Sequence, residues 1–170
     1  MNKAIRPLAV AAIAALALTG CTSWPGSGGK VGTTRIPDEK VVRTAEVMTA
    51  ATGAASTDAL RSAAFDLTLG EASRQVVAAN GIEFTPADKA AEVANSASAQ
   101  AIIAAGGQEW ADAVATTSLA IDRLGDERFL TGLRGLDIQI NPRYGTWSPE
   151  QFRMLDSSLS KSIEALQINR

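Results

Sequence analysis

The chain has 170 residues, with 16 basic and 18 acidic side chains, no histidine and one cysteine. Without histidine there is no Ser-His-Asp or Cys-His nucleophile and no imidazole metal site, and one cysteine cannot form an intramolecular disulfide or a thiolate cluster. The near-neutral charge balance argues against a nucleic-acid partner, which usually requires an excess of Lys and Arg on one face. We expect no cofactor and no bound metal.

The first twenty-one residues have the features of an export signal. Lys3 and Arg6 give a positive start, and an unbroken apolar run follows from Leu8 to Leu18. A helix needs roughly 20 apolar residues to span the hydrocarbon, so this run is too short for a stable transmembrane segment and has the length of a secretory signal. The sequence Leu18-Thr19-Gly20-Cys21 then resembles the lipobox of bacterial lipoproteins.

This resemblance implies that residues 1–20 are a lipoprotein signal peptide and that Cys21 becomes the lipidated N-terminus. The alternatives are an ordinary cleaved signal that contains a cysteine, or an uncleaved anchor. A diacylglyceryl group supplies two acyl chains, which is enough for stable anchoring. Loss of Lys3 and Arg6 leaves 14 of the 16 basic side chains against 18 acidic ones, a net charge of −4. We therefore predict a protein held on the outer face of the cell membrane by lipid.

The predicted elements follow a short tether. Thr22–Gly29 has the Pro, Gly and Ser content of a flexible linker, so residues 21–30 are interpreted as the lipidated cysteine and its tether. Val31–Ile36 is predicted to be a short strand that Pro37 ends.

Five helices are predicted next, from their caps and apolar spacing. Thr85 followed by Pro86 is a typical N-cap and first helical position, and the middle of that helix is almost entirely small or polar. It has little to bury, so we expect it to be the most exposed and mobile element. The predicted ranges are Pro37–Thr52, Thr57–Ala79, Thr85 to a stop at Gly106-Gly107, Gln108–Thr116 and Ser118–Leu136.

The end of the chain is predicted to contain a strand and a helix. Asp137–Asn141 alternates apolar and polar residues and reads as a strand, which could pair with Val31–Ile36 and close the domain. A capping box at Ser148 predicts a terminal amphipathic helix over residues 148–170, which could pack on the domain, on another subunit or on the membrane. Its apolar residues are Phe152, Leu155, Leu159, Ile163 and Leu166. The predicted fold class is mainly α, with four to six helices and a small two-stranded β element.

No pattern in the chain points convincingly to catalysis. Ser158–Lys161 fits the S-x-x-K pattern of penicillin-binding proteins, but no S-D-N or K-T-G motif accompanies it. The adjacent acids Asp38-Glu39 and Asp126-Glu127 point to different parts of a helix surface and make no acid/base pair. We therefore predict that the protein is not an enzyme.

One segment concentrates residue types that dominate binding interfaces. Arg143, Tyr144 and Trp147 lie together beside turn formers, in the sequence N-P-R-Y-G-T-W. A Tyr and a Trp can also close the end of a small core, with Arg143 completing a hydrogen-bond network. We favour the structural interpretation and keep peptide contact as the alternative.

The order of lipobox, short strand, Ala-rich helices and the closing segment from Ile138 to Trp147 resembles a group of actinobacterial lipoproteins related to the SurA N-terminal domain. The resemblance covers most of residues 21–147 and leaves out the last helix. It implies a SurA N-terminal-like helical domain over residues 31–147 and an extracytoplasmic holding activity without a parvulin domain. The tentative peptide-binding residues are Phe65, Leu69, Trp110, Phe129, Arg143, Tyr144 and Trp147.

Three functional hypotheses follow. The first is a membrane-anchored, chaperone-like holder that exposes apolar side chains in a thin-cored helical cradle and binds exported unfolded polypeptides. The alternative is a non-catalytic cell-envelope adaptor that binds one specific folded partner through the terminal helix. The third, an enzyme, would need an active site built without histidine. The sequence leaves the oligomeric state open.

Overall fold

The computed structural model describes residues 24–148 and 153–155. In this part of the chain, six α-helices and two small antiparallel sheets form the fold, so the predicted mainly α class is confirmed. The helices are α1 (Asp38–Thr52), α2 (Ser56–Ala79), α3 (Pro86–Val93), α4 (Ala97–Ala104), α5 (Gln108–Leu124) and α6 (Asp126–Arg134). The strands are β1 (Ser27–Val31), β2 (Thr34–Pro37), β3 (Ile138–Ile140), β4 (Thr146–Ser148) and β5 (Arg153–Leu155), with a 3-10 turn, η1 (Pro142–Tyr144).

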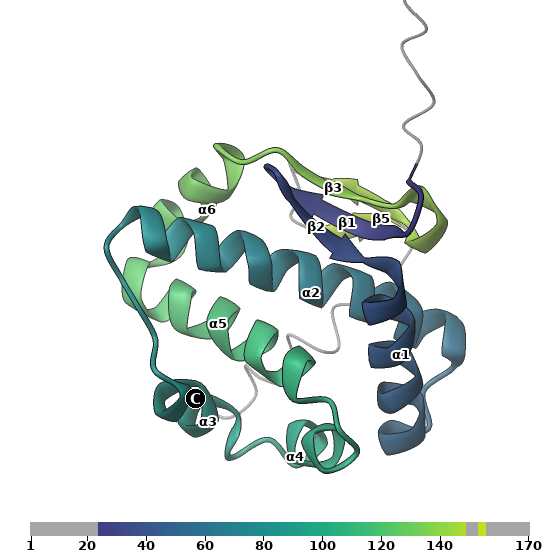
Figure 1. Cartoon of the computed structure of the whole chain (residues 1–170). Helices are drawn as coiled ribbons and strands as arrows, with labels where there is room; N and C mark the ends of the chain where they lie inside the picture. Colours follow the sequence, from purple (N-terminus) through teal and green to yellow (C-terminus); the bar gives the residue numbers. More distant parts are fainter. Residues whose placement is uncertain (1–23, 149–152, 156–170) are drawn as a thin grey trace, which may run out of the picture.

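The elements stack in layers around α2. Figure 1 shows the sheet at the top, α2 beneath it and α5 on the other side of α2, with α1 crossing one end and α3 and α4 at the far end from the sheet. Small residues let α2 and α5 approach closely. A Cβ built on Gly70 would lie 2.5 Å from the Cβ of Ala113, and the hydroxyls of Ser73 and Thr117 lie 3.1 Å apart.

The strand order of the larger sheet is β2-β1-β3. The pairing predicted between Val31–Ile36 and Asp137–Asn141 holds only at Val31, which is opposite Ile138; the other residues opposite β3, Gly29 and Lys30, precede the predicted strand. The predicted single strand over Val31–Ile36 is wrong. The chain turns at Gly32 and Thr33, where Gly32 has φ +57°, and forms the hairpin β1–β2. The β element therefore has three strands rather than two.

The prediction of a tether through Gly29 is also wrong, because β1 begins at Ser27. Its glycines serve close packing. A Cβ on Gly28 would lie 2.4 Å from a methyl of Val41, and a Cβ on Gly29 would lie 2.3 Å from the hydroxyl oxygen of Thr68. Composition alone suggested a linker, whereas these glycines let the central strand lie directly against α1 and α2.

The helix predictions are confirmed for α1 and α2 and need correction further along. The helix predicted from Thr85 to Gly106-Gly107 is two helices, α3 and α4, separated at residues 94–96. Ser96 caps α4 by accepting a hydrogen bond from the Ala99 amide at 3.2 Å. The break predicted after Thr116 is absent, because α5 runs on to Leu124. The chain breaks instead at Gly125, whose φ of +75° is poorly accessible to other residues.

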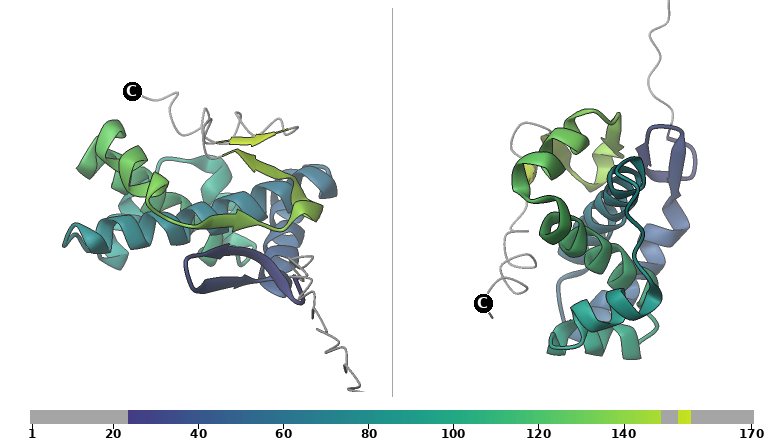
Figure 2. Two further views of the ribbon diagram at one scale, coloured as in Figure 1. Left: turned by 90° about the horizontal axis from the view of Figure 1, so that it is seen from above. Right: turned by 90° about the vertical axis from the view of Figure 1, so that its left-hand side faces the viewer.

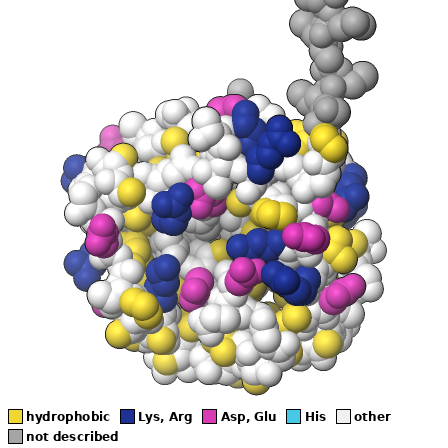
Figure 3. Space-filling view, in the orientation of Figure 1, with side chains coloured by type: hydrophobic (Ala, Val, Ile, Leu, Met, Phe, Trp, Pro, Cys, Tyr) yellow, Lys and Arg dark blue, Asp and Glu magenta, His cyan; other side chains and the backbone are white. Residues whose placement is uncertain are grey.

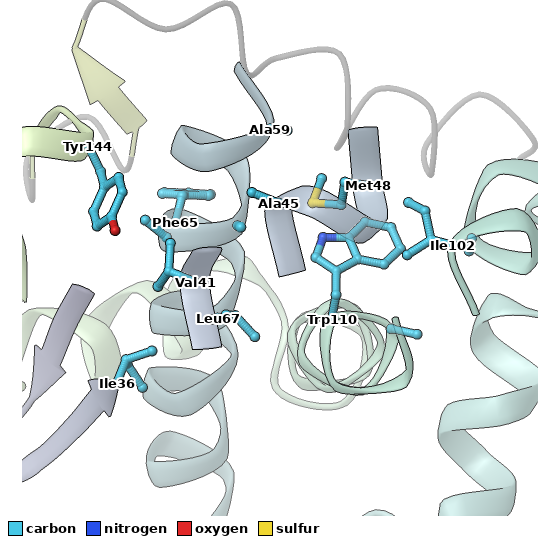
Figure 4. Packing of buried hydrophobic residues seen from close by; sticks show 14 of the residues in the cluster. Ile36, Val41, Ala45, Met48, Ala59, Phe65, Leu67, Ile102, Trp110 and Tyr144 are labelled. Atoms are coloured by element: carbon cyan, nitrogen blue, oxygen red, sulfur yellow. The ribbon is translucent and has the colours of Figure 1, made fainter. Parts of the chain in front are cut away.

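Two apolar cores lie on either side of the close α2–α5 contact. The larger one joins α1, α2, α4, α5 and η1. In Figure 4, Trp110 lies beside Met48 and Ile102, and Tyr144 lies toward Phe65 and Val41. The smaller core contains Val31, Ala72, Val76, Val77, Ala120, Leu124, Phe129 and Leu133.

The helix predicted from Ser148 is wrong in the part that the structure describes. Residues 153–155 form β5, which pairs antiparallel with β4; Trp147 is opposite Met154. The ring of Trp147 packs against Phe65 with centroids 5.6 Å apart, so this hairpin is fixed to α2. The remainder of the predicted helix and the whole leader with Cys21 lie outside the described residues.

Candidate functional site

The N-P-R-Y-G-T-W segment ties the end of the sheet to the start of α1. The side chain of Asn141 caps η1 by accepting from the Arg143 amide at 3.1 Å, and its amide donates to the Ser27 carbonyl at 2.9 Å. The Tyr144 hydroxyl donates to Asp38 at 2.5 Å, and the Arg143 guanidinium donates to both Asp38 and the Tyr144 hydroxyl. These contacts fit the structural interpretation of this segment, in which Arg143 completes a hydrogen-bond network at the end of the core.

The pKa of Tyr144 is raised above its ordinary value. Burial is the main cause, and the hydrogen bond to Asp38 acts in the same direction, while the guanidinium of Arg143 opposes both. A phenol that stays protonated keeps donating to the carboxylate at the start of α1. This network therefore holds η1 against α1 rather than preparing a proton for transfer.

Asp66 is a buried acid that the sequence analysis did not single out. It lies on α2 and is 8% exposed, and its carboxylate accepts a hydrogen bond from the indole N–H of Trp110 on α5 at 2.6 Å. Burial raises its pKa to about 7, and the Trp110 hydrogen bond only partly offsets this. The sequence does contain a signal for a buried acid here, because Asp66 is the only charged residue between Arg61 and Glu71.

A second polar group that the sequence analysis missed connects α2 to the β1–β2 hairpin. Glu71 accepts hydrogen bonds from Arg74 and from Gln75, and Gln75 donates to the Val31 carbonyl at 3.2 Å. Desolvation by burial is the largest single influence on the pKa of Glu71, and it acts to raise it. The hydrogen bonds and the charge of Arg74 together outweigh desolvation, so the pKa is lowered. This network fixes the hairpin to the helix.

The structure distributes the tentative peptide-binding residues between the two cores. Four are between 3% and 6% exposed: Phe65, Trp110, Phe129 and Tyr144. Leu69 and Trp147 are half-buried and Arg143 is exposed. Phe129 belongs to the smaller core and the other aromatic residues pack on the larger one, so the seven residues do not form one continuous surface.

The surface of the described domain is mixed in charge and poor in large apolar groups. Over residues 24–148, every Val, Leu, Ile, Met, Phe, Tyr and Trp is buried or half-buried, and the exposed apolar side chains are alanines and prolines. Figure 3 shows basic and acidic side chains interspersed on one face, with apolar atoms in small separate patches. The large apolar side chains of residues 24–148 are therefore at most partly exposed.

The described residues contain neither a candidate membrane-spanning helix nor a candidate metal site. No helix among them is long and apolar enough to cross a bilayer, and no group of three or more His, Cys, Asp or Glu side chains in the same ranges is placed to hold a metal ion. The chain matches no model of a known protein family, no curated protein and no solved structure. The resemblance to SurA-type lipoproteins stays a prediction.

Proposed function

We propose that this protein is a non-catalytic lipoprotein on the outer face of the cell membrane, where its domain acts as an adaptor for another envelope protein. The observation that supports this proposal most is how soon the fold follows Cys21. The Ser27 amide donates to the Trp24 carbonyl at 3.2 Å, so the described fold begins at Trp24. Only Thr22 and Ser23 separate it from the cysteine.

Two intervening residues give the anchor very little reach. Three steps of the chain span at most about 11 Å between the Cα atoms of Cys21 and Trp24. The headgroup layer is itself roughly 6 Å thick on each side of the bilayer. A lipidated Cys21 would therefore hold the domain against the membrane surface, a position that suits a protein that meets other membrane-bound proteins.

The distribution of apolar side chains favours an adaptor over a holder. A holder of unfolded chains needs apolar surface open to solvent, and over residues 24–148 every large apolar side chain is buried or half-buried. Interfaces between separately folded proteins are about as apolar as ordinary protein surface. A surface of mixed charge with few large exposed apolar groups is compatible with such a contact.

Localisation tests the anchor. Cys21→Ser should move the protein from the membrane fraction to the soluble or secreted fraction, and Ser23→Ala, two residues away, should leave it in the membrane. An unchanged distribution of Cys21→Ser would refute lipid anchoring.

Crosslinking tests the adaptor role. A photoreactive residue at the exposed alanines Ala91, Ala101 or Ala104 leaves both cores intact. In the native envelope we expect one recurrent partner. A broad set of unrelated unfolded clients would overturn the adaptor and support the holder. In that case the soluble Cys21→Ser protein should also slow the aggregation of an unfolded client at an equimolar ratio.

A further inference from the structure

The outer face of the three-stranded sheet carries a row of polar side chains. Lys30 is opposite Arg35 on one side and Gln139 on the other. Directly opposed residues share a face of a sheet, so these three lie together. Ile36 and Ile140, one position along, are buried on the inner face against the helices. We refer to Lys30, Arg35 and Gln139 as the outer sheet face.

No described helix covers this face. Seen from above, no described helix lies over these strands (Figure 2). Arg35 is exposed, and the side chain of Lys30 is 35% exposed. Natural proteins usually cover one face of an antiparallel sheet and leave the other face in contact with a polar medium.

The chain enters the fold through this sheet. β1 is its central strand, and the turn from Trp24 to Ser27 leads directly into β1. Since only Thr22 and Ser23 precede Trp24 after the cysteine, the sheet is the layer of the domain nearest to the anchor. In Figure 1, α3 and α4 lie at the opposite end.

The charge of this face differs from that of the rest of the domain. Residues 24–148 carry 11 basic and 15 acidic side chains, a net charge of −4. On the outer sheet face Lys30 and Arg35 outnumber Asp137, the one carboxylate that pairs with Lys30, at 3.4 Å. Basic side chains near an anionic membrane surface are attracted to it.

We propose that the outer sheet face lies on the phosphate headgroup layer of the membrane, with α3 and α4 directed away from it. This inference rests on the proposed lipid anchor at Cys21. Trp24, half-buried beside the sheet, then lies at the headgroup level that tryptophan prefers. The end of the domain that contains α3 and α4 is left available to a protein partner.

The test uses a spin label on the lipidated protein in phosphatidylglycerol–phosphatidylcholine vesicles that contain a nickel-chelating headgroup lipid. Lipidation consumes the one natural thiol of the chain, so a single introduced cysteine is labelled uniquely. Gln139→Cys places the label on the outer sheet face, and Ala91→Cys on α3 is the matched control. Thr33→Cys in the hairpin turn replaces Gln139→Cys if that variant does not fold.

Headgroup nickel should relax the label at position 139 several-fold faster than the label at position 91, and Arg35→Glu should reduce the difference. Equal relaxation at the two positions, or faster relaxation at 91, would overturn the orientation. Mass analysis of the Cys21 peptide separates the two proposals. A lipidated Cys21 with equal relaxation refutes only the orientation, whereas an unmodified Cys21 refutes the anchor and the orientation together.

Discussion

The indole N–H of Trp110 donates a hydrogen bond of 2.6 Å to the buried carboxylate of Asp66, and this contact joins α5 to α2 inside the larger core. Burial raises the pKa of Asp66 from 3.8 to about 7, with the Trp110 hydrogen bond acting weakly against it. A carboxyl in this position is neutral over much of the range in which it is ionised in the unfolded chain. The stability of the fold must therefore depend on pH.

The free energy of unfolding should fall as the pH rises from about 4 to about 7. In this window the folded protein binds a proton at Asp66 that the unfolded chain has already released, so each unit of pH lowers stability. The full effect is about 4 kcal/mol, at about 1.4 kcal/mol per pKa unit. Asp66→Asn should remove this slope in urea titrations of Cys21→Ser protein at pH 4.5 to 8. A slope that is the same in both proteins would show that Asp66 is not its source.

Thr68→Val should stabilise the domain by about 1 kcal/mol, because it removes a buried hydroxyl that costs free energy without a hydrogen bond. The Thr68 side chain is fully buried, and its oxygen has no hydrogen-bond partner among the described residues. Thr68→Ser keeps the hydroxyl and loses the methyl, so it is the matched control and should destabilise. Denaturation midpoints measure both changes, and a lower midpoint for Thr68→Val would contradict the prediction.

Gly70→Ala should destabilise the domain although alanine is the better helix former. The new Cβ would lie 2.5 Å from the Cβ of Ala113 and 2.7 Å from its Cα, so α2 and α5 must separate. Overpacking of this kind costs roughly 1–3 kcal/mol, more than the gain in helix propensity of up to about 1 kcal/mol. The double change with Ala113→Gly should recover part of the loss in thermal unfolding. Gly70→Ala with unchanged or raised stability would refute the close contact.

Removing residues 148–170 should destabilise the fold. This deletion takes away β5 and the end of β4, and with them the pairing that holds Trp147 against Phe65. Loss of that partly buried aromatic contact should cost about 2 kcal/mol. Thermal unfolding of the truncated and full-length chains gives the comparison, and an unchanged midpoint would contradict the prediction.

Local patterns in the sequence determined much of the helical framework. The Pro37-Asp38-Glu39 start of α1 and the Asn80-Gly81 end of α2 act within one or two turns of chain, so both helices could be predicted closely. The alternation in Asp137–Asn141 identified β3 in the same way. The lipobox-like pattern that ends at Cys21 is likewise local, and the lipid anchor proposed from it depends on no tertiary contact.

The tertiary structure decided what the small residues do and which large ones are covered. In the sequence, Gly28 and Gly29 are typical of a linker and Gly70 of a weak helix position. Their role in close packing depends on tertiary contacts with Val41, Thr68 and Ala113. Pairing with β4 makes residues 153–155 a strand despite their helical spacing. In each case the deciding contact joins residues that local patterns do not connect, because packing distance and strand partners are properties of the assembled chain.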